Sequence, residues 1–474
     1  MKFSPREFRS QADAALNDRT LQQALVRARS GFVNKRAKAV AALPEFEVLR
    51  AEASAIRVDA LNRLPDLLEQ FEAGVLAAGG QVHWATDAAE ARRIVVGIAQ
   101  QREACRVAKG KTMVGEEIGI NPALEAAGIN VVETDLGEYI IQLAQEPPSH
   151  IVAPAVHKTR EQVAELFAQH HRRDERLAAL SGIPELVDEA RRVLRETFLS
   201  ADLGITGGNF LVADSGSVVL VTNEGNGDLS ATLPKTHIVI AGIEKVVPTM
   251  TEATTLLRVL ARSATGQPLT TYTSVFTGAR RATDETGPEE FHVVLVDNGR
   301  SAMLASELRD MLRCIRCGAC MNHCPVYGAI GGHAYGWVYP GPMGQVLTPW
   351  LLGPERAPDL AHACTLNGHC AQVCPVGIPL PDLIRAMRVR EHESHVNTFA
   401  ERWVFQQWTW WAKRPALYGW ALRAKARWLH RLARPGSALR RLPVWSAWFR
   451  GRDLPTPQGR TLRDLMREKL RGAR

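Results

Sequence analysis

The residues with the clearest chemical potential are cysteines, because seven of the eight fall between Cys314 and Cys374. The first four are Cys314, Cys317, Cys320 and Cys324, followed by Pro325, which spells the bacterial ferredoxin run C-x2-C-x2-C-x3-C-P. In this spacing three thiolates surround one cubic iron–sulfur cluster, whereas the fourth reaches a second cluster. A structural zinc site would show two separated cysteine pairs instead. The run therefore predicts iron–sulfur chemistry.

A second run, Cys364, Asn367, Cys370 and Cys374 followed by Pro375, repeats this spacing with asparagine at the second position. Two-cluster ferredoxins exchange one ligand between runs. By this rule, the ligands of cluster one are Cys314, Cys317, Cys320 and Cys374. Those of cluster two are Cys324, Cys364 and Cys370, so cluster two lacks its fourth thiolate at Asn367.

The missing thiolate leaves three outcomes for cluster two. It can be a 3Fe-4S cluster, a 4Fe-4S cluster whose fourth corner binds water, Asn367 or His369, or a weakly held cluster. An amide oxygen is a poor partner for soft iron–sulfide chemistry, so we favour the first two. The loss of an anionic ligand is expected to raise the reduction potential. The expected cofactors are one 4Fe-4S cluster and a second cluster, either 4Fe-4S with a non-cysteine corner or 3Fe-4S.

Length and composition limit which classes of protein the chain can belong to. With 474 residues, 46% hydrophobic and 23% charged, the sequence is typical of several folded domains and excludes wholesale disorder. No apolar run approaches the roughly 18 residues of a spanning helix, and the N-terminal residues lack a secretory signal. We therefore expect a cytoplasmic protein, in which clustered thiols bind metal rather than form disulfides.

Residue patterns suggest four regions. Residues 1–110 have a mostly helical pattern and are expected to pack on an α/β domain at 111–300. Residues 301–390 form the α-helical two-cluster ferredoxin-like module, and 391–474 a basic helical tail. Short apolar runs predict the strands of a partly parallel sheet: Ile129–Val132, Ile151–Val152, Phe210–Val212, Val218–Val221, His237–Ile240 and Val293–Val296.

Glycine-rich turns border these strands, at 204–209 and 223–227. Such turns can hold an anion on backbone N–H groups, or they can be purely structural. No dinucleotide or P-loop motif accompanies them. Glu224 and Glu252 are acid–base candidates, although lone glutamates usually lie on solvated faces. Cys105 is expected to be a small buried hydrophobic residue.

The tail carries the positive charge of the chain. Residues 401–474 hold 18 Lys and Arg against 4 Asp and Glu, which leaves the remainder acidic. Eight of eleven tryptophans lie there, at 403, 408, 410, 411, 420, 428, 445 and 448. Helical phase places Arg423, Arg427, Arg431 and Arg434 on one face. Such a helix can contact an anionic membrane, dock on a partner or pack on its own acidic body; nucleic-acid binding is not expected.

With these features assembled, the sequence resembles the lactate utilisation protein B family over nearly its whole length. The resemblance rests on the Cys314 run and on six further segments: KTMVGEEI (111–118), DLGEYIIQL (135–143), HIVAPAVHK (150–158), GITGGNF (204–210), IGGHAYG (330–336) and YPGP (339–342). It implies a LUD domain, similar in fold to the ribose-phosphate isomerase and CoA-transferase-like group. The family usually carries cysteine where this chain has Asn367, which puts a second 4Fe-4S cluster in question.

The resemblance also implies that the protein works with a second, Cys-rich iron–sulfur protein and a small LUD protein to oxidise L-lactate to pyruvate. Our hypothesis is an electron-transfer component rather than a stand-alone catalyst, with no catalytic residue assigned. One alternative is an iron–sulfur subunit of another 2-hydroxy-acid or quinone-linked oxidoreductase. Another is a binding protein that senses redox state or a metabolite. Peripheral contact with the inner membrane is an alternative for the tail.

Overall fold

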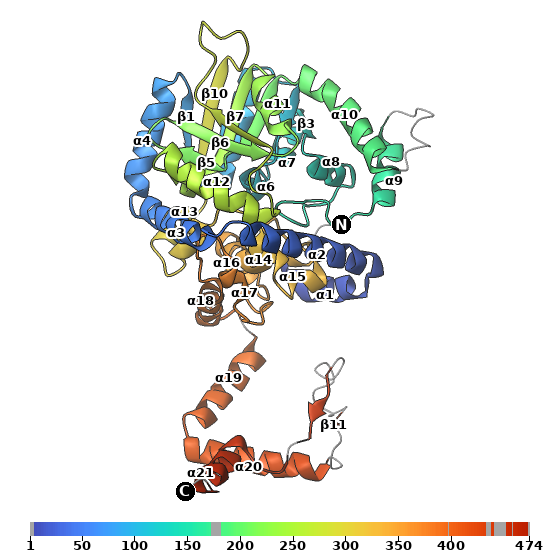
Figure 1. The fold of residues 1–474 in the computed structure, drawn as a ribbon, viewed down its shortest axis with the longest axis vertical. Coiled ribbons are helices and arrows are strands. Elements are labelled where there is room, and N and C mark those ends of the chain that lie inside the picture. Colours follow the sequence, from blue (N-terminus) through green and yellow to red (C-terminus); the bar gives the residue numbers. More distant parts are fainter. Residues whose placement is uncertain are drawn as a thin grey trace. The chain divides into compact units, whose positions relative to one another are not determined.

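The computed structural model describes residues 4–171, 182–396, 398–432, 438–439, 452–456 and 458–472 (Figure 1). The chain forms two compact units, Met1–Val396 and Asn397–Arg474. The first contains two sheets, the helices around them and the cysteine-rich segment, and the second contains the tail. Arg434, Trp445 and Trp448, which contribute to the predicted basic and aromatic character of the tail, lie outside the described residues.

A six-stranded parallel sheet organises the first unit, in the order β1-β10-β7-β4-β2-β3. Its strands are β1 (Gln81–Ala85), β2 (Arg106–Lys109), β3 (Asn130–Glu133), β4 (Leu203–Gly207), β7 (Thr236–Gly242) and β10 (Glu290–Val296). Every residue of β7 is buried. Such continuous apolar strands are typical of parallel sheets that helices cover on both faces.

Alternate residues of β7 serve the two faces of this sheet. Ile238 and Ile240 pack with α5 (Ala88–Gln101), α6 (Met113–Ile118) and α7 (Ile120–Ala126). Val239 and Ala241 instead pack with α4 (Leu64–Ala77). This division follows from the two-residue period of a strand. The predicted α/β domain is therefore confirmed.

The first unit contains a second sheet of four strands, in the order β8-β5-β6-β9. This sheet contains β5 (Phe210–Val212), β6 (Ser217–Thr222), β8 (Val246–Val247) and β9 (Tyr272–Phe276). The short helix α11 (Asn226–Thr232) follows β6, and α12 (Met250–Ala264) follows β8. Residues 204–207 of the first predicted glycine-rich turn belong to strand β4 instead, and only 208–209 connect it to β5; residues 223–225 of the second connect β6 to α11, whose first residues are 226–227.

A satellite core packs α8 (Leu136–Leu143) with α9 (Arg160–His170) and α10 (Ile183–Ser200). Helix α9 begins at a complete capping box. The Thr159 side chain accepts from the Gln162 N–H, and Gln162 Oε1 accepts from the Thr159 N–H. This reciprocal pair satisfies two backbone donors that the helix leaves unpaired.

The N-terminal helices are α1 (Phe8–Asn17), α2 (Arg19–Ala41) and α3 (Phe46–Asn62). They share one hydrophobic core with α12 and the cysteine-rich segment, and Figure 1 shows α14 to α18 gathered beside α1 and α2. Short helices make up this segment: α13 (Arg300–Leu304), η4 (Arg309–Arg313), α14 (Ala319–Asn322), α15 (Tyr327–Ile330), η5 (His333–Tyr335), α16 (Gly341–Leu352), α17 (His369–Gln372) and α18 (Leu380–Glu393).

Arg57 of α3 joins these parts through its buried guanidinium. It donates to the backbone carbonyls of Val246 at 3.0 Å, Leu312 at 3.1 Å and Arg313 at 3.3 Å, and also to that of Glu244. The residue is only 1% exposed. One side chain therefore fixes the strand β8 and the entry to the first cysteine run against the same helix.

The second unit contains α19 (Phe399–Ala412), α20 (Pro415–Leu432), β11 (Ala438–Leu439), β12 (Leu454–Pro455) and α21 (Leu462–Gly472). Helix α19 begins at a capping box formed by Thr398 and Glu401. It exposes several tryptophans, among them Trp403 and Trp408. Within the described part of the chain, no helix combines the length and apolar character required to cross a membrane.

Three local expectations differ from the structure. Residues predicted to be helical contain β1 and β2, so the sheet draws on the chain before residue 111. The strand β2 is short and follows α5 closely, so the helical residue pattern of α5 hides it in the sequence. The pair Ile151–Val152 is not a strand, since prolines flank it on both sides. Cys105 is exposed rather than buried, because it lies in the connection between α5 and β2.

Candidate iron–sulfur and ligand sites

Four thiols of the cysteine-rich segment line one small cavity: Cys314, Cys317, Cys320 and Cys374. The first three belong to the approach to α14 and to α14 itself, whereas Cys374 follows α17. Much of the remaining wall is apolar, formed by Met311, Ile315, Met343, Val376, Ile378 and Leu380. The cavity thus collects three thiols from the first run and one from the second, and we call these four the first thiol group.

Cys324, Cys364 and Cys370 form the second thiol group. Burial raises the pKa of Cys324, and the nearby Cys364 thiol adds to this effect. Burial and the charges of Cys364 and Cys324 raise the pKa of Cys370 to about 12. This group therefore joins one thiol of the first run to two of the second.

The two runs have the same backbone shape. Arg316 and Gly318 have positive φ angles of 60° and 74°, and the equivalent Leu366 and Gly368 have 54° and 83°. The Arg316 N–H donates to Cys314 Sγ at 3.4 Å, and the Leu366 N–H donates to Cys364 Sγ at 3.3 Å. Left-handed residues turn the chain tightly, so the two runs make the same tight turn after their first cysteine.

These residues fit iron–sulfur clusters. Burial raises the pKa of Cys317 and Cys320, and neighbouring thiols in the same group add to the shift. Several thiolates this close together repel one another unless a cation lies among them. All eight cysteines are free. Further backbone N–H groups donate to sulfur, from Tyr327 to Cys324 at 3.5 Å and from Ile378 to Cys374 at 3.4 Å, as is typical of cluster ligands.

Asn367 takes the place of a thiol in the second run. Its Oδ1 accepts a hydrogen bond from the His369 N–H at 3.2 Å. In the first run, Cys317 accepts from the N–H of Ala319, two residues further on, in the same way. The asparagine oxygen therefore occupies the position of a ligand sulfur. Both Leu366 and Asn367 are exposed, so this corner of the second thiol group faces solvent.

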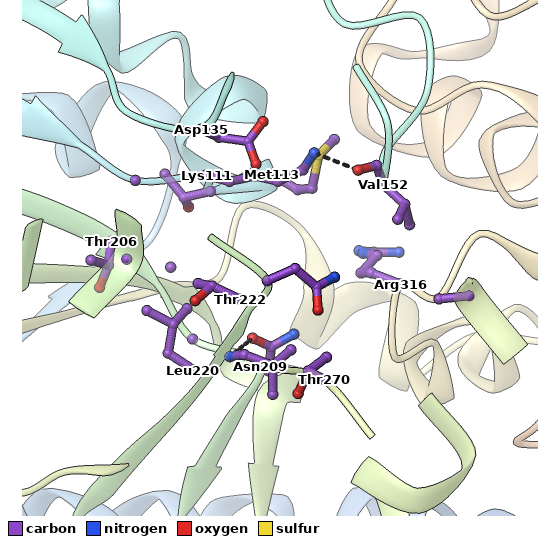
Figure 2. Close-up of a pocket in the computed structure, with 18 of the residues that line it drawn as sticks. Lys111, Met113, Asp135, Val152, Thr206, Asn209, Leu220, Thr222, Thr270 and Arg316 are labelled. Atoms are coloured by element: carbon purple, nitrogen blue, oxygen red, sulfur yellow. Dashed lines mark hydrogen bonds between the residues drawn. The ribbon is translucent and has the colours of Figure 1, made fainter. Parts of the chain in front are cut away.

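A larger cavity of about 260 Å³ lies beside the first thiol group (Figure 2). Its wall includes residues that follow β2 and β4, among them Lys111, Gly208 and Asn209. Arg316 and Cys317 of the first cysteine run complete it. The carboxyl ends of parallel strands are a common place for ligands. Cys317 also lines the smaller cavity, so the two cavities share this residue.

Charged residues of both signs line the larger cavity. Asp135 and Glu224 accept hydrogen bonds from the first turn of α8, from the N–H groups of Glu138 at 3.1 Å and Leu136 at 3.2 Å. Burial and the nearby Asp135 raise the pKa of Glu224. Lys245, a positively charged residue of the same cavity, is buried. Its burial and the nearby charge of Arg316 lower the pKa of Lys245 to about 8.

Arg316 reaches from the cysteine run into the α/β domain. Its Nη2 is 3.4 Å from Glu244 Oε1, and its guanidinium carbon lies 4.7 Å from the centre of the Tyr339 ring. Arg300 continues this network with ion pairs of 2.7 Å to Glu244 and to Glu117. Nothing in the sequence singles out these residues except that Arg316 lies between two cysteines of the first run.

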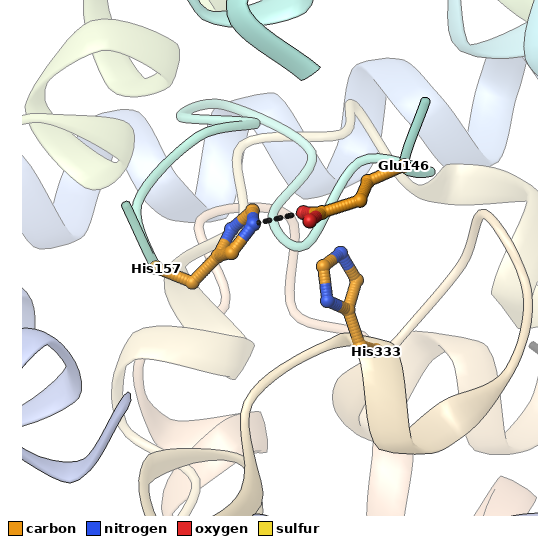
Figure 3. A group of neighbouring side chains, drawn as sticks. All are labelled: Glu146, His157 and His333. Atoms are coloured by element: carbon orange, nitrogen blue, oxygen red, sulfur yellow. Dashed lines mark hydrogen bonds and ion pairs between the residues drawn. The ribbon is translucent and has the colours of Figure 1, made fainter. Parts of the chain in front are cut away.

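Glu146, His157 and His333 form a separate cluster that joins the α/β domain to the cysteine-rich segment (Figure 3). His157 Nε2 is 2.7 Å from Glu146 Oε2, and the Lys158 ammonium lies 2.6 Å from the other oxygen. The ammonium already compensates the carboxylate charge. His333 Nε2 bonds the carbonyl of Pro147 at 2.8 Å. These contacts give the cluster a structural role in holding the two parts together.

Comparison with protein families agrees with this architecture. Residues 68–296 match the LUD domain, residues 310–378 match a 4Fe-4S dicluster domain, and residues 385–471 match the C-terminal domain of lactate utilisation protein B. The α/β domain and the cysteine-rich segment thus define an iron–sulfur protein of the LUD-domain class. The first match begins well before residue 111, which agrees with the early strands of the sheet.

Relatives span the whole chain. "Lactate utilization protein B" of Lysinibacillus sphaericus is 41% identical over 100% of this chain and 99% of its own, and that of Bacillus pumilus is 42% identical over 99% and 98%. The "Uncharacterized electron transport protein YkgF" of Escherichia coli is 43% identical, again over 99% and 98%. The chain belongs to the lactate utilization protein B family, which confirms the resemblance seen in the sequence.

One solved structure is also similar. A DUF162 family protein from Deinococcus radiodurans has 14% sequence identity and a TM-score of 0.28, and the match covers 49% of this chain and 98% of that chain. A score this low carries no argument about the fold.

Proposed function

We propose that this chain is the iron–sulfur electron-transfer subunit of a complex that oxidises L-lactate to pyruvate. The observation that carries the proposal is the pair of neighbouring thiol groups, each built from both cysteine runs. The match to a dicluster domain and the names of the relatives support it. In this role the chain is an electron-transfer component rather than a stand-alone catalyst.

In this proposal Cys314, Cys317, Cys320 and Cys374 hold cluster one, a 4Fe-4S cluster. Cys324, Cys364 and Cys370 hold cluster two, which is either 3Fe-4S or 4Fe-4S with a corner not bound by cysteine at Asn367. When bound, such clusters accept and release one electron at a time. The chain supplies the thiolates and the N–H donors to sulfur that stabilise the added charge.

Two arginines of the N-terminal helices contribute to this stabilisation. Arg50 Nε donates to the Cys374 carbonyl at 2.8 Å, and Arg36 Nη2 donates to the Val373 carbonyl at 3.1 Å. Both guanidinium groups thereby lie beside the first thiol group. A nearby positive charge favours the reduced state of a redox centre over the oxidised state, so these arginines raise the potential of cluster one.

The partners in this proposal are a Cys-rich iron–sulfur protein and a small LUD protein of the lactate utilisation system. The relatives' names support a role within such a system. The protein acts in the cytoplasm, and the exposed tryptophans of α19 offer a surface for a partner subunit or for peripheral contact with the inner membrane. Nucleic acid is not a partner, since the net positive charge is confined to the tail.

The test combines a gene deletion with spectroscopy. We expect the deletion strain to lose growth on L-lactate and to recover it with the wild-type gene but not with Cys317→Ser. The anaerobically purified protein should show reducible electron paramagnetic resonance signals from two centres. Normal growth on L-lactate, with loss of growth on another 2-hydroxy acid, would assign the protein to a different oxidoreductase. Protein without iron after anaerobic reconstitution would overturn the proposal altogether.

A further inference from the structure

We propose that the 260 Å³ cavity beside the first thiol group binds a small organic acid, whose carboxylate is held by Lys245 and Arg316. Under the proposed function, on which this inference rests, the ligand class is a 2-hydroxy or 2-oxo monocarboxylate. The acid would then bind on this chain, in the cavity next to the first thiol group, rather than on another subunit alone.

Two positive side chains in the cavity wall have donors without hydrogen-bond partners among the described residues. Lys245 is only 6% exposed, yet within the described part of the chain its ammonium has no hydrogen bond or ion pair. Arg316 Nη1 is also buried without a hydrogen-bond partner. Both residues line the cavity. Burying an unpaired ammonium or an unsatisfied guanidinium donor is costly, so Lys245 and Arg316 Nη1 indicate that an anion binds near them.

Among the described residues, no negative side chain of the cavity or beside it forms an ion pair with Lys245 or bonds Arg316 Nη1. Asp135 and Glu224 are occupied by backbone N–H groups of α8. Glu244 contacts Arg316 through Nη2, which leaves Nη1 available. A guanidinium and an ammonium that face one space are well suited to a carboxylate, because both make charge-assisted hydrogen bonds. The free donors of the cavity are therefore positive, and an oxyanion matches them.

Neutral groups complete the site. Asn209 Oδ1 accepts from the Val221 N–H at 3.0 Å, which fixes the side chain and leaves its amide NH₂ as a donor. In Figure 2 the Arg316 guanidinium points into the space between Lys111 and Asn209. The glycines at 207 and 208 bring backbone close to the same space. This is the glycine-rich turn for which the sequence left an anion-binding role open.

The size of the cavity favours a small metabolite. Its volume of about 260 Å³ lies just below the roughly 300–1,000 Å³ of pockets that hold drug-sized ligands. A three-carbon acid fits with room for ordered water, whereas a dinucleotide does not. Cys317 lines both this cavity and the first thiol group, so a bound acid lies next to a cluster ligand.

The test measures binding to the anaerobically purified, cluster-containing full-length chain. L-Lactate, pyruvate and inorganic phosphate are titrated separately by calorimetry. We expect lactate or pyruvate to bind, and Lys245→Met to weaken this binding by roughly 10- to 100-fold, the loss of one charge-assisted hydrogen bond. Lys235→Met is the matched control, because Lys235 is exposed and immediately precedes the opposite end of β7; its affinity should equal that of the wild type.

A second measurement covers the case in which Lys245→Met folds poorly. Saturating pyruvate should shift the resonance of cluster one in the wild type, and Lys111→Met should weaken this shift as well. Phosphate binding without carboxylate binding would overturn the assignment, as would failure of all three ligands. If the acids fail to bind while the deletion strain still loses growth on lactate, this inference falls and the proposed function stands. The opposite pair of results would reject the proposed function and leave the binding site.

Discussion

Replacing Asn367 with cysteine should lower the reduction potential of cluster two and complete its set of thiolates. Asn367 Oδ1 already accepts the backbone bond that Cys317 sulfur accepts in the first run. The flanking residues have the left-handed conformations of the first run. A thiol at this exposed position therefore needs no rearrangement of the backbone to reach the place of a fourth ligand.

The size of the shift follows from adding one negative charge near the redox electron. At about 5 Å and an effective dielectric constant of about 40, suited to an exposed corner, Coulomb's law gives about 1.7 kcal/mol. This corresponds to about 70 mV for a one-electron couple. A dielectric constant of about 20 would double the value. The negative charge stabilises the oxidised cluster more, so the potential falls.

A redox titration followed by electron paramagnetic resonance measures this shift, together with iron and sulfide analysis of the same samples. Asn367→Cys should contain more iron than the wild type if cluster two is 3Fe-4S. Thr365→Cys is the matched control, because it adds a thiol to the same exposed loop outside the ligand spacing. Equal potentials for Asn367→Cys and the wild type, or an equal shift in Thr365→Cys, would refute the reasoning.

Three further results are expected. Cys374→Ser should remove the signal of cluster one although it lies in the second run, and Cys324→Ser that of cluster two; the reverse pattern in resonance spectra would exclude the ligand exchange. Arg57→Met should cost roughly 3 kcal/mol or more of unfolding free energy in urea, since it leaves buried carbonyls unpaired, whereas exposed Arg63→Met should cost little. Burial lowers the pKa of His237 from 6.5 to about 3, so the unfolded state binds the extra proton as pH falls below about 6.5. Unfolding free energy should drop by about 2 kcal/mol between pH 7 and pH 5 from this residue, and His237→Leu should show a flatter pH profile.

That Cys314, Cys317, Cys320 and Cys374 gather in one place could be predicted from sequence, because the spacing of each cysteine run is short and local; their role as cluster ligands stays a prediction. The strands β5, β6, β7 and β10 were also predictable, since each is an uninterrupted apolar run between turns. The strands β1 and β2 were not, because each mixes polar with apolar residues and adjoins a strongly helical stretch. Short strands depend on their neighbours in the sheet rather than on their own pattern.

The residues of the larger cavity could be predicted from sequence only in part. Glu224 and the glycine-rich turn were identified as candidates from the sequence, and both line it. Lys245 and Arg316 were not, because an isolated lysine or arginine is usually solvated. What distinguishes them is burial with donors left unpaired, and this arises only when the cysteine run packs against the carboxyl ends of the strands. Tertiary contacts, not local residue types, create that property.

The crossing of Cys374 and Cys324 between the two runs has a consequence for assembly. Under the proposed function, each cysteine run supplies one ligand to the cluster that the other run mainly binds. Insertion of one cluster therefore positions a ligand of the other, and the two clusters should be inserted cooperatively. Under the proposed function, oxygen that attacks cluster two at its solvent-facing corner beside Asn367 would release Cys324 and loosen the run that also holds cluster one, so damage to cluster two would extend to cluster one.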